Sequence, residues 1–446
     1  MSSDDLSDRF ERAARGNDVT GAQLAVLRQG ELRTFELGER EHGTGEPMSG
    51  STKVPVGSIT KTFTTTLLMA LVSDGDLDLD APVAEYLPEM HRISGDLVDL
   101  LTTRHLLSHT GGLAADYAGP AEADHFPLGG CFLDTLQRPG VGFSYSNLGY
   151  VLAGHLVEAL TGMTWWEAMR AIVLKPMGIT AASIVAPDRS PSAPSVATGH
   201  AVNRARGLVR TVEQTLEPAE APAGALALSA SDLVALGRMH LRPEHGGTAA
   251  GPVGQAELAE MRRPVPSADP FGLADGWALG LALFRGGATT WLGHDGMADG
   301  TSCYLRVDPT GGTVIALTTN SGSGSAMWRD LCAELRPTGL HIGAHHALTG
   351  AERRTAPPRD CVGEYVNGDT VYSAVIRGDH VSLVVDGDSA ATLTLYEGLV
   401  FSVTDVTTGE QGYAGRFLRN ARDGRVDRIQ IGGRVAAKRR RAREAA

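Results

Sequence analysis

The chain has 446 residues, 42% hydrophobic and 21% charged, with a formal net charge of -12. This length exceeds what one hydrophobic core usually covers, so two or three structural units are expected. The acidic balance argues against nucleic acid as a partner, because a negative surface repels phosphate backbones.

The N-terminal segment is polar and charged, without the apolar run of a secretory signal, and no stretch of about 18 apolar residues predicts a membrane span. We therefore expect a cytoplasmic protein with no membrane partner. The four cysteines are scattered, which favours reduced thiols over a disulfide framework or a zinc site. No metal motif, phosphate loop or dinucleotide fingerprint is present, so we expect no cofactor.

Apolar and polar residues alternate over residues 20–40 on both sides of Gln29-Gly30, which predicts a β-hairpin. Further on, apolar residues at helical spacing alternate with Gly, Pro and Asp-rich segments. Gly75 should end the first helix, and Ser231 should cap the third. The predicted helices cover 58–73, 148–171 and 233–241, and the predicted strands cover 289–292, 302–307 and 314–319. Strands at both ends with helices between them predict one sheet built from both termini, with a helical insert.

Ala356-Pro357-Pro358-Arg359 is the best candidate for a linker. After it, short alternating segments separated by turns predict a small antiparallel β-barrel or sandwich. These strands are expected at 371–376, 381–385, 392–396, 399–403 and 426–431. We therefore divide the chain into a catalytic unit at 1–350, a barrel at 356–438 and a solvated basic tail at 439–446.

The central chemical motif is Ser58-Ile59-Thr60-Lys61, at the start of the first predicted helix. Ser58 and Lys61 should share one helix face, about one turn apart. A serine hydroxyl needs a base beside it to act as a nucleophile, and a partly buried lysine serves because desolvation lowers its pKa. By itself the tetrapeptide is a weak signal, since an N-cap Ser beside an exposed Lys gives the same pattern.

A second motif is Tyr145-Ser146-Asn147, at the start of the second predicted helix. A tyrosine near cations can relay a proton, and the Asn147 amide can hold a substrate carbonyl or the lysine side chain. Tyr365-Val366-Asn367 has the same spacing. It lies in the predicted barrel, where Tyr is ordinary strand filling, so we discount it.

The third motif is Gly293-His294-Asp295-Gly296, between two predicted strands. An edge strand here can supply a backbone N–H to an oxyanion, and Met297 is the candidate donor together with the N–H of Ser58. Asp295 and Gly296 are further candidates for binding substrate. His109, in a second His-x-Gly, lies in a loop and is read as structural.

In this order, the three motifs resemble the serine β-lactamase-like family, which includes class C β-lactamases, D-aminopeptidases and related esterases. The connecting segments Leu106–Leu113, Pro176–Ile179 and Pro222–Leu226 resemble it as well, and the likeness covers most of residues 20–330. It implies an α/β (α+β) fold with an antiparallel sheet flanked by helices. It also implies that Ser58 forms an acyl-enzyme, that Lys61 and Tyr145 shuttle protons, and that Asn147 orients the reacting groups.

His294 stands where many members of that family carry Lys, which removes a fixed positive charge and argues against an efficient β-lactamase. With the following barrel and the missing secretion signal, the chain is most similar to the penicillin-binding-protein-type thioesterases of nonribosomal peptide pathways, the surugamide-cyclase type. That resemblance implies a lipocalin-like barrel that covers the site. Arg434, near the end of the last predicted strand of this barrel, is expected to face the site. The resemblance also implies a peptide or acyl substrate delivered by a peptidyl carrier protein and released as a head-to-tail macrocycle.

Two other functions stay open on the sequence. A cytosolic esterase or D-amino-acid peptidase would use water as the acceptor of the acyl group. Whether water or an amine is the acceptor depends on how well the site excludes water. A non-catalytic binding or sensor protein on the same scaffold would carry an inert Ser58; the intact Ser58, Lys61 and Tyr145 argue against it.

Overall fold

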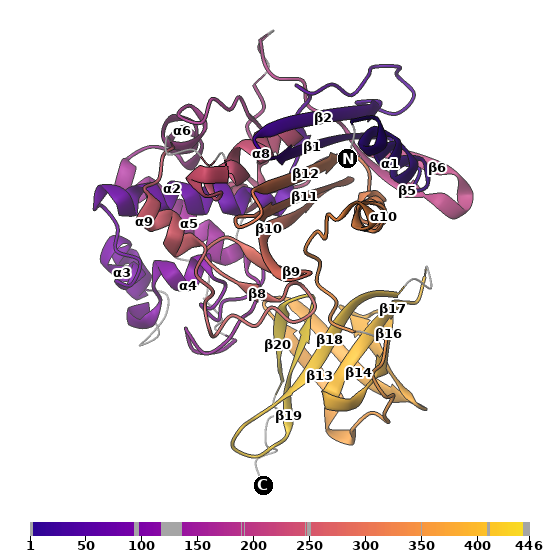
Figure 1. Cartoon of the computed structure of the whole chain (residues 1–446). Helices are drawn as coiled ribbons and strands as arrows, with labels where there is room; N and C mark the ends of the chain where they lie inside the picture. Colours follow the sequence, from indigo (N-terminus) through magenta and orange to yellow (C-terminus); the bar gives the residue numbers. More distant parts are fainter. Residues whose placement is uncertain are drawn as a thin grey trace.

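The computed structural model describes residues 3–92, 98–116, 136–188, 190, 192–245, 247, 251–348, 350–407 and 411–439. The chain forms a sheet flanked by helices and, after it, a closed barrel (Figure 1). Cys131 and the basic tail beyond Arg439 lie outside the described residues. No helix in the described part of the chain is long and apolar enough to cross a bilayer.

The central sheet has seven antiparallel strands in the order β2-β1-β12-β11-β10-β9-β8. Its first hairpin turns at Gln29 and Gly30, both with positive φ, as a tight two-residue hairpin requires. β1 pairs with β12, so the prediction of one sheet built from both termini is confirmed. The strands are β1 (Gly21–Arg28), β2 (Glu31–Gly38), β8 (Gly276–Trp277), β9 (Ala282–Gly286), β10 (Thr289–Ala298), β11 (Thr301–Asp308) and β12 (Thr313–Thr319).

Both faces of this sheet are covered, which explains why its inner strands β11 and β12 are buried along their whole length. On β1, Leu24 and Val26 pack against helices α1 (Ser3–Arg15) and α10 (Gly324–Leu335). The alternate residues Ala25 and Leu27 face a larger core that includes α2 (Thr60–Asp74), α5 (Asn147–Thr161) and α8 (Ala230–Met239). Successive side chains of a strand point to opposite faces, so each strand contributes to both cores.

α2 is the innermost helix, buried on every side from Thr60 to Leu71. Its threonine hydroxyls are satisfied internally: Thr62 donates to the carbonyl of Gly280 at 2.8 Å and Thr64 to that of Pro222 at 2.7 Å. Gly75, in the left-handed conformation, ends the helix as predicted. The helix begins later than predicted, because Ser58 lies in the 3₁₀ turn η1 (Gly57–Ile59) that precedes it.

Three predicted boundaries were wrong for local reasons. The expected helix over 148–171 breaks at Gly162, whose φ is +69°, and a capping box at Thr164 starts the next helix. α8 is capped by Ser229 rather than Ser231, because the Ser229 hydroxyl accepts from the N–H of Asp232 and the Asp232 carboxylate accepts in return. β10 continues through His294 to Ala298, so it is longer than the predicted strand 289–292 and includes the third motif.

The remaining elements before the barrel are short and connect these layers. Among them, β3, β7 and β4 form a three-stranded sheet, and β5 and β6 form a hairpin. Their bounds are β3 (Val54–Pro55), α3 (Val83–Tyr86), η2 (Pro88–Arg92), η3 (Val98–Leu100), α4 (Thr103–Leu107), α6 (Trp165–Ala168), η4 (Met169–Leu174), β4 (Ala182–Ser183), β5 (Gly199–Asn203), η5 (Arg204–Arg206), β6 (Leu208–Val212), η6 (Pro218–Glu220), α7 (Ala221–Gly224), β7 (Leu226–Leu228), η7 (Pro243–His245), α9 (Gln255–Met261) and η8 (Arg336–Thr338).

The C-terminal part is a closed antiparallel barrel of eight strands, β13 to β20 in sequence order. Pairing of β13 with β20 closes it around a core that contains Tyr365, Phe401 and Phe417. The five predicted strands are present, and β13, β18 and β20 were missed. β13 and β20 form the closing pair, and β18 pairs with β17 and β19. The strands are β13 (Gly363–Asn367), β14 (Thr370–Arg377), β15 (His380–Val385), β16 (Asp388–Leu395), β17 (Val400–Asp405), β18 (Gln411–Arg419), β19 (Val426–Ile431) and β20 (Arg434–Lys438).

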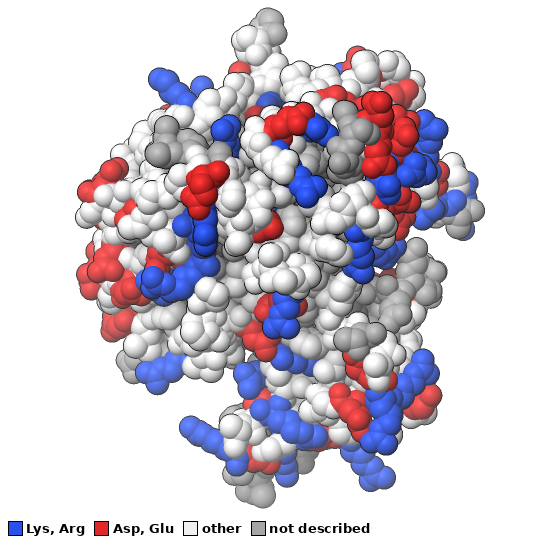
Figure 2. All heavy atoms as spheres, in the orientation of Figure 1, with Lys and Arg blue, Asp and Glu red and all other residues white. Residues whose placement is uncertain are grey.

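Charge is distributed unevenly between the two parts. Figure 2 shows Asp and Glu gathered on the sheet-and-helix part, in the regions of α1 and α3, with Lys and Arg frequent over the visible face of the barrel. Three cysteines lie in the described residues, and none of them is in a disulfide.

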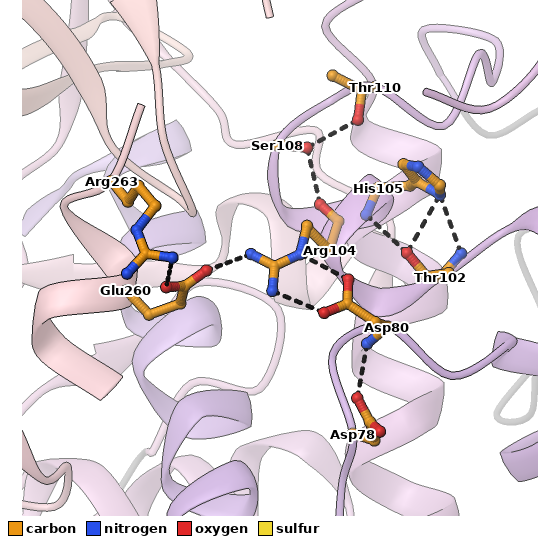
Figure 3. A network of polar contacts seen from close by, with 9 residues as sticks. All are labelled: Asp78, Asp80, Thr102, Arg104, His105, Ser108, Thr110, Glu260 and Arg263. Atoms are coloured by element: carbon orange, nitrogen blue, oxygen red, sulfur yellow. Dashed lines mark hydrogen bonds and ion pairs between the residues drawn. The ribbon is translucent and has the colours of Figure 1, made fainter. Parts of the chain in front are cut away.

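A polar network ties α4 to its neighbours (Figure 3). The Arg104 guanidinium contacts both carboxylate oxygens of Asp80, at 2.6 and 2.9 Å, and also pairs with Glu260 on α9. The carbonyl of Arg104 accepts from the Ser108 hydroxyl at 2.7 Å, and that hydroxyl lies 2.8 Å from the Thr110 hydroxyl. The network therefore fixes the loop that carries His109, between Ser108 and Thr110.

We expect Arg104→Met to lower the thermal unfolding midpoint by about 2–4 °C, because it removes the partner of Asp80 and leaves the partly buried Glu260 with the exposed Arg263 alone. Thermal scans by circular dichroism measure this shift. Arg353→Met is the matched control, since Arg353 pairs with Glu397 in solvent, with both side chains more than half exposed, and such pairs contribute little. Equal shifts in the two variants would show that the Arg104 network does not stabilise the fold.

Candidate active site

Ser58 and Lys61 meet where η1 runs into α2. The Lys61 ammonium nitrogen lies 3.2 Å from the Ser58 hydroxyl and donates to the carbonyl of Ala223, on α7, at 2.9 Å. The Lys61 side chain is completely buried. The predicted juxtaposition of hydroxyl and amine is therefore present, although a 3₁₀ turn supplies the serine.

Burial sets the charge state of Lys61. Desolvation, followed by the positive charge of Arg434, lowers the pKa of Lys61 to about 7, while the more distant carboxylates of Asp116 and Glu220 act in the opposite direction. Among the described residues, no carboxylate forms an ion pair with this amine. A substantial fraction of Lys61 is thus neutral near pH 7 and able to accept a proton.

Tyr145 approaches the same point from the segment before α5. The Lys61 nitrogen lies 5.1 Å from the centre of its ring. Burial raises the pKa of Tyr145 well above its usual value, against smaller opposing effects of the Ser58 hydroxyl and Arg434. The phenol is therefore protonated at neutral pH. Its buried oxygen makes no hydrogen bond of ordinary length within the described residues, which leaves it free for a substrate atom.

The backbone of β10 lies directly against η1. A Cβ at Gly57, whose φ is +50°, would come within 2.1 Å of the Met297 carbonyl oxygen and 2.9 Å of its nitrogen. A Cβ at Gly296 would come within 1.9 Å of the Val56 carbonyl oxygen. Only glycine fits at these two positions, and the close approach places the Met297 backbone beside Ser58. Met297 itself is 58% exposed, so its side chain does not fill the site.

His294 is held in one tautomer. Its Nδ1 lies 2.6 Å from the carbonyl oxygen of Asp295 and donates to it, while Nε2 is buried and has no partner among the described residues. Burial, followed by the Lys61 charge, lowers the pKa of His294 to about 4. The ring is therefore neutral at pH 7, with an acceptor lone pair on Nε2.

The Asp295 carboxylate is held in an ion pair with the neighbouring strand β11. It lies 2.5 Å from Arg306, which is 2% exposed and stacks with its guanidinium 3.5 Å from the Phe284 ring centre. Arg306 also donates to the carbonyl of Gly343 at 3.1 Å. Asp295 thus anchors the strand that carries His294, and Gly296 supplies close packing against Val56.

Asn147 and Arg434 converge on Asp116. The Asn147 amide donates to the Asp116 carboxylate at 2.7 Å, and Arg434 lies 3.5 Å from the same oxygen. Arg434 extends from the barrel to within 5.9 Å of the Tyr145 ring centre. The structure thus places Arg434 between Asp116 and the Tyr145 ring. The described hydrogen bond of the Asn147 amide runs to Asp116 instead of Lys61.

Several contacts were not foreseen from sequence. His109 lies 4.2 Å from Tyr145 between ring centres, and its Nδ1 accepts from the N–H of Ser146 at 3.1 Å. Trp277 stands edge-on to His294 at 5.3 Å. The contacts of Asp116 with Asn147 and of the Ala223 carbonyl with Lys61 were also not predicted. These contacts join residues far apart in the chain, and aromatic and backbone contacts follow no spacing rule in the sequence.

Comparison with known proteins agrees with this geometry. The Beta-lactamase family matches residues 6–331. Penicillin-binding protein 4 of Amycolatopsis lactamdurans is 32% identical over 337 residues, which are 74% of this chain and 88% of that protein.

The crystal structure of SurE superposes with a TM-score of 0.87 at 36% identity, over 98% of this chain and 99% of the other; SurE with D-Leu gives 0.85. A penicillin-binding protein homologue from Pyrococcus abyssi shares the fold at 21% identity, with a TM-score of 0.62. The chain therefore belongs to the β-lactamase family of serine hydrolases, and its likeness to SurE includes the barrel.

Proposed function

We propose that this enzyme is a penicillin-binding-protein-type thioesterase, which takes a linear peptide from a carrier-protein thioester and releases it as a head-to-tail macrocycle. The observation that carries the proposal is the buried Lys61 amine, 3.2 Å from Ser58, in a site whose outer wall is the barrel residue Arg434. Similarity to SurE over catalytic part and barrel together supports this function over that of a β-lactamase.

In the first step, the Ser58 oxygen attacks the thioester carbonyl and its proton passes to the Lys61–Tyr145 pair. The C–S bond breaks as the carbonyl re-forms, and the sulfur leaves with a proton from the same pair. The backbone N–H groups of Ser58 and Met297 are the proposed oxyanion donors; one such donor typically contributes about a hundredfold or more to turnover.

In the second step, the N-terminal amine of the same peptide attacks the acyl-enzyme. The amine loses its proton to the Lys61–Tyr145 pair, and Ser58 regains one as its ester bond breaks. Neutral His294 offers an acceptor lone pair on one wall, and Arg434 with Asn147 lines another. The D-Leu in the SurE crystal structure supports an acyl group that ends in a D-residue. A peptidyl carrier protein is the proposed partner.

The decisive measurement is incubation with a soluble thioester of a linear peptide ending in a D-residue. We expect mass spectrometry to show a product that has lost only the thiol, which is the macrocycle. Ser58→Ala should abolish product formation and keep the wild-type circular dichroism spectrum. Exclusively linear acid from several such peptides would identify a hydrolase, and turnover by Ser58→Ala would exclude Ser58 as the nucleophile.

Tyr145→Phe should lower kcat by about a hundredfold or more, because it removes a proton-transfer group while keeping the ring against His109 and Trp277. Tyr396→Phe is the control, since it removes a phenol from the barrel whose hydroxyl lies 3.4 Å from the Ser402 hydroxyl. Single-turnover assays with the same thioester measure both. An unchanged rate in Tyr145→Phe would remove the phenol from the mechanism.

The rate of Ser58 acylation should rise with pH and level off, with a midpoint of about 7. The sign follows from Lys61: its pKa is lowered to about 7, so the active neutral amine accumulates above that pH. His294, with a pKa of about 4, does not titrate in this range. Arg434→Gln should move the midpoint upward, because it removes a positive charge that disfavours the ammonium. A midpoint near 10 would show that Lys61 is not desolvated in solution.

A further inference from the structure

Beside the Arg434–Asp116 ion pair, the buried side-chain amide of Asn367 links the barrel to the catalytic part. Asn367, the last residue of β13, is 4% exposed. Its Oδ1 accepts from the N–H of Ala115 at 2.7 Å, and its Nδ2 donates to the carbonyl of Val435 at 2.8 Å. Both halves of the amide are therefore used, one on each side of the interface.

These two partners are the chain neighbours of the ion pair. Ala115 precedes Asp116, and Val435 follows Arg434, whose guanidinium lies 3.5 Å from the Asp116 carboxylate. The carbonyl of Ala115 also accepts from the N–H of Asn147 at 2.6 Å. One side chain thus fixes the backbone beside both members of the pair.

The surrounding contacts leave this link little freedom. The ladder between β13 and β20 ends at Val366 and Ala437, so the Asn367 side chain replaces it as the connection to Val435. The N–H of Val435 donates to the Ser144 hydroxyl at 3.1 Å, and the carbonyl of Gly433 accepts from the N–H of Tyr145 at 3.0 Å. The start of β20 is therefore held against the segment that carries Tyr145.

We propose that Asn367 is a positioning residue, which holds the Arg434–Asp116 pair beside Tyr145. It thereby determines how well the site holds the acyl peptide while its N-terminal amine attacks the acyl-enzyme. This inference rests on the proposed function, in which Arg434 binds substrate. Asn367 acts through the ion pair and does not contact the reacting atoms. The barrel is accordingly a fixed wall of the site, with its substrate-facing arginine set by an amide that spans the interface.

A double-mutant cycle between Asn367 and Arg434 tests this, measured as kcat/KM for cyclic product from the D-terminated peptide thioester. Asn367→Ala should lower it about tenfold or more, since small displacements of positioning groups are costly. The double variant with Arg434→Ala should lie within about threefold of Arg434→Ala alone, because both changes remove one interaction. Asn420→Ala is the matched control: Asn420 bonds Asp427 elsewhere in the barrel and should change kcat/KM less than about twofold.

Losses that multiply in the double variant would overturn the proposal, as would wild-type activity in Asn367→Ala. Asn367→Asp is a second variant, which keeps the acceptor for Ala115 and places a second acceptor against the Val435 carbonyl; we expect a loss at least as large as that of Asn367→Ala. If both variants unfold at the assay temperature, Asn367 is a residue of the fold and the positioning role is refuted. If the wild type makes only linear acid, the proposed cyclisation is refuted. The double-mutant cycle, with kcat/KM measured for thiol release, then still tests the role of Asn367.

Discussion

The site depends on one electrostatic constraint, the complete burial of the Lys61 amine without a carboxylate paired to it in the described residues. Its two contacts are neutral oxygens, the Ser58 hydroxyl and the Ala223 carbonyl. A buried ammonium is costly unless it is paired, so the structure favours the neutral amine near pH 7. The innermost helix α2, enclosed on every side, maintains this environment.

The second constraint is the approach of three separate segments to that amine. Glycines at 57 and 296 let η1 and β10 come into backbone contact, and the barrel turn at Gly433 accepts from the backbone of Tyr145. These contacts use backbone atoms, which have less freedom than side chains. The barrel therefore belongs to the site's architecture as much as the sheet does, and the likeness to SurE extends over both.

The polarity of the walls bears on the choice of acceptor. His294 is neutral, Tyr145 is protonated, and the cation facing the site from the barrel is Arg434, already shared with Asp116. A site of this kind binds a peptide through neutral donors and acceptors more than through a fixed charge. That arrangement suits an acyl group whose carboxyl is held as a thioester, and it gives no strong cation for the carboxylate of a free β-lactam at the position of His294.

Sequence alone determined the fold family, the nucleophile motif and the presence of a barrel, because these depend on short-range spacing and on alternation within single segments. It placed the helix start at Ser58 wrongly, because a 3₁₀ turn precedes α2, and it placed the cap of α8 at Ser231 where Ser229 forms the capping box. It also discounted Asn367 as part of an ordinary barrel strand. The amide's role, the convergence of Asp116 with Arg434, and the lowered pKa of Lys61 were decided by tertiary structure. Each joins residues far apart in the chain, and burial, which controls their energies, is a property of the folded molecule.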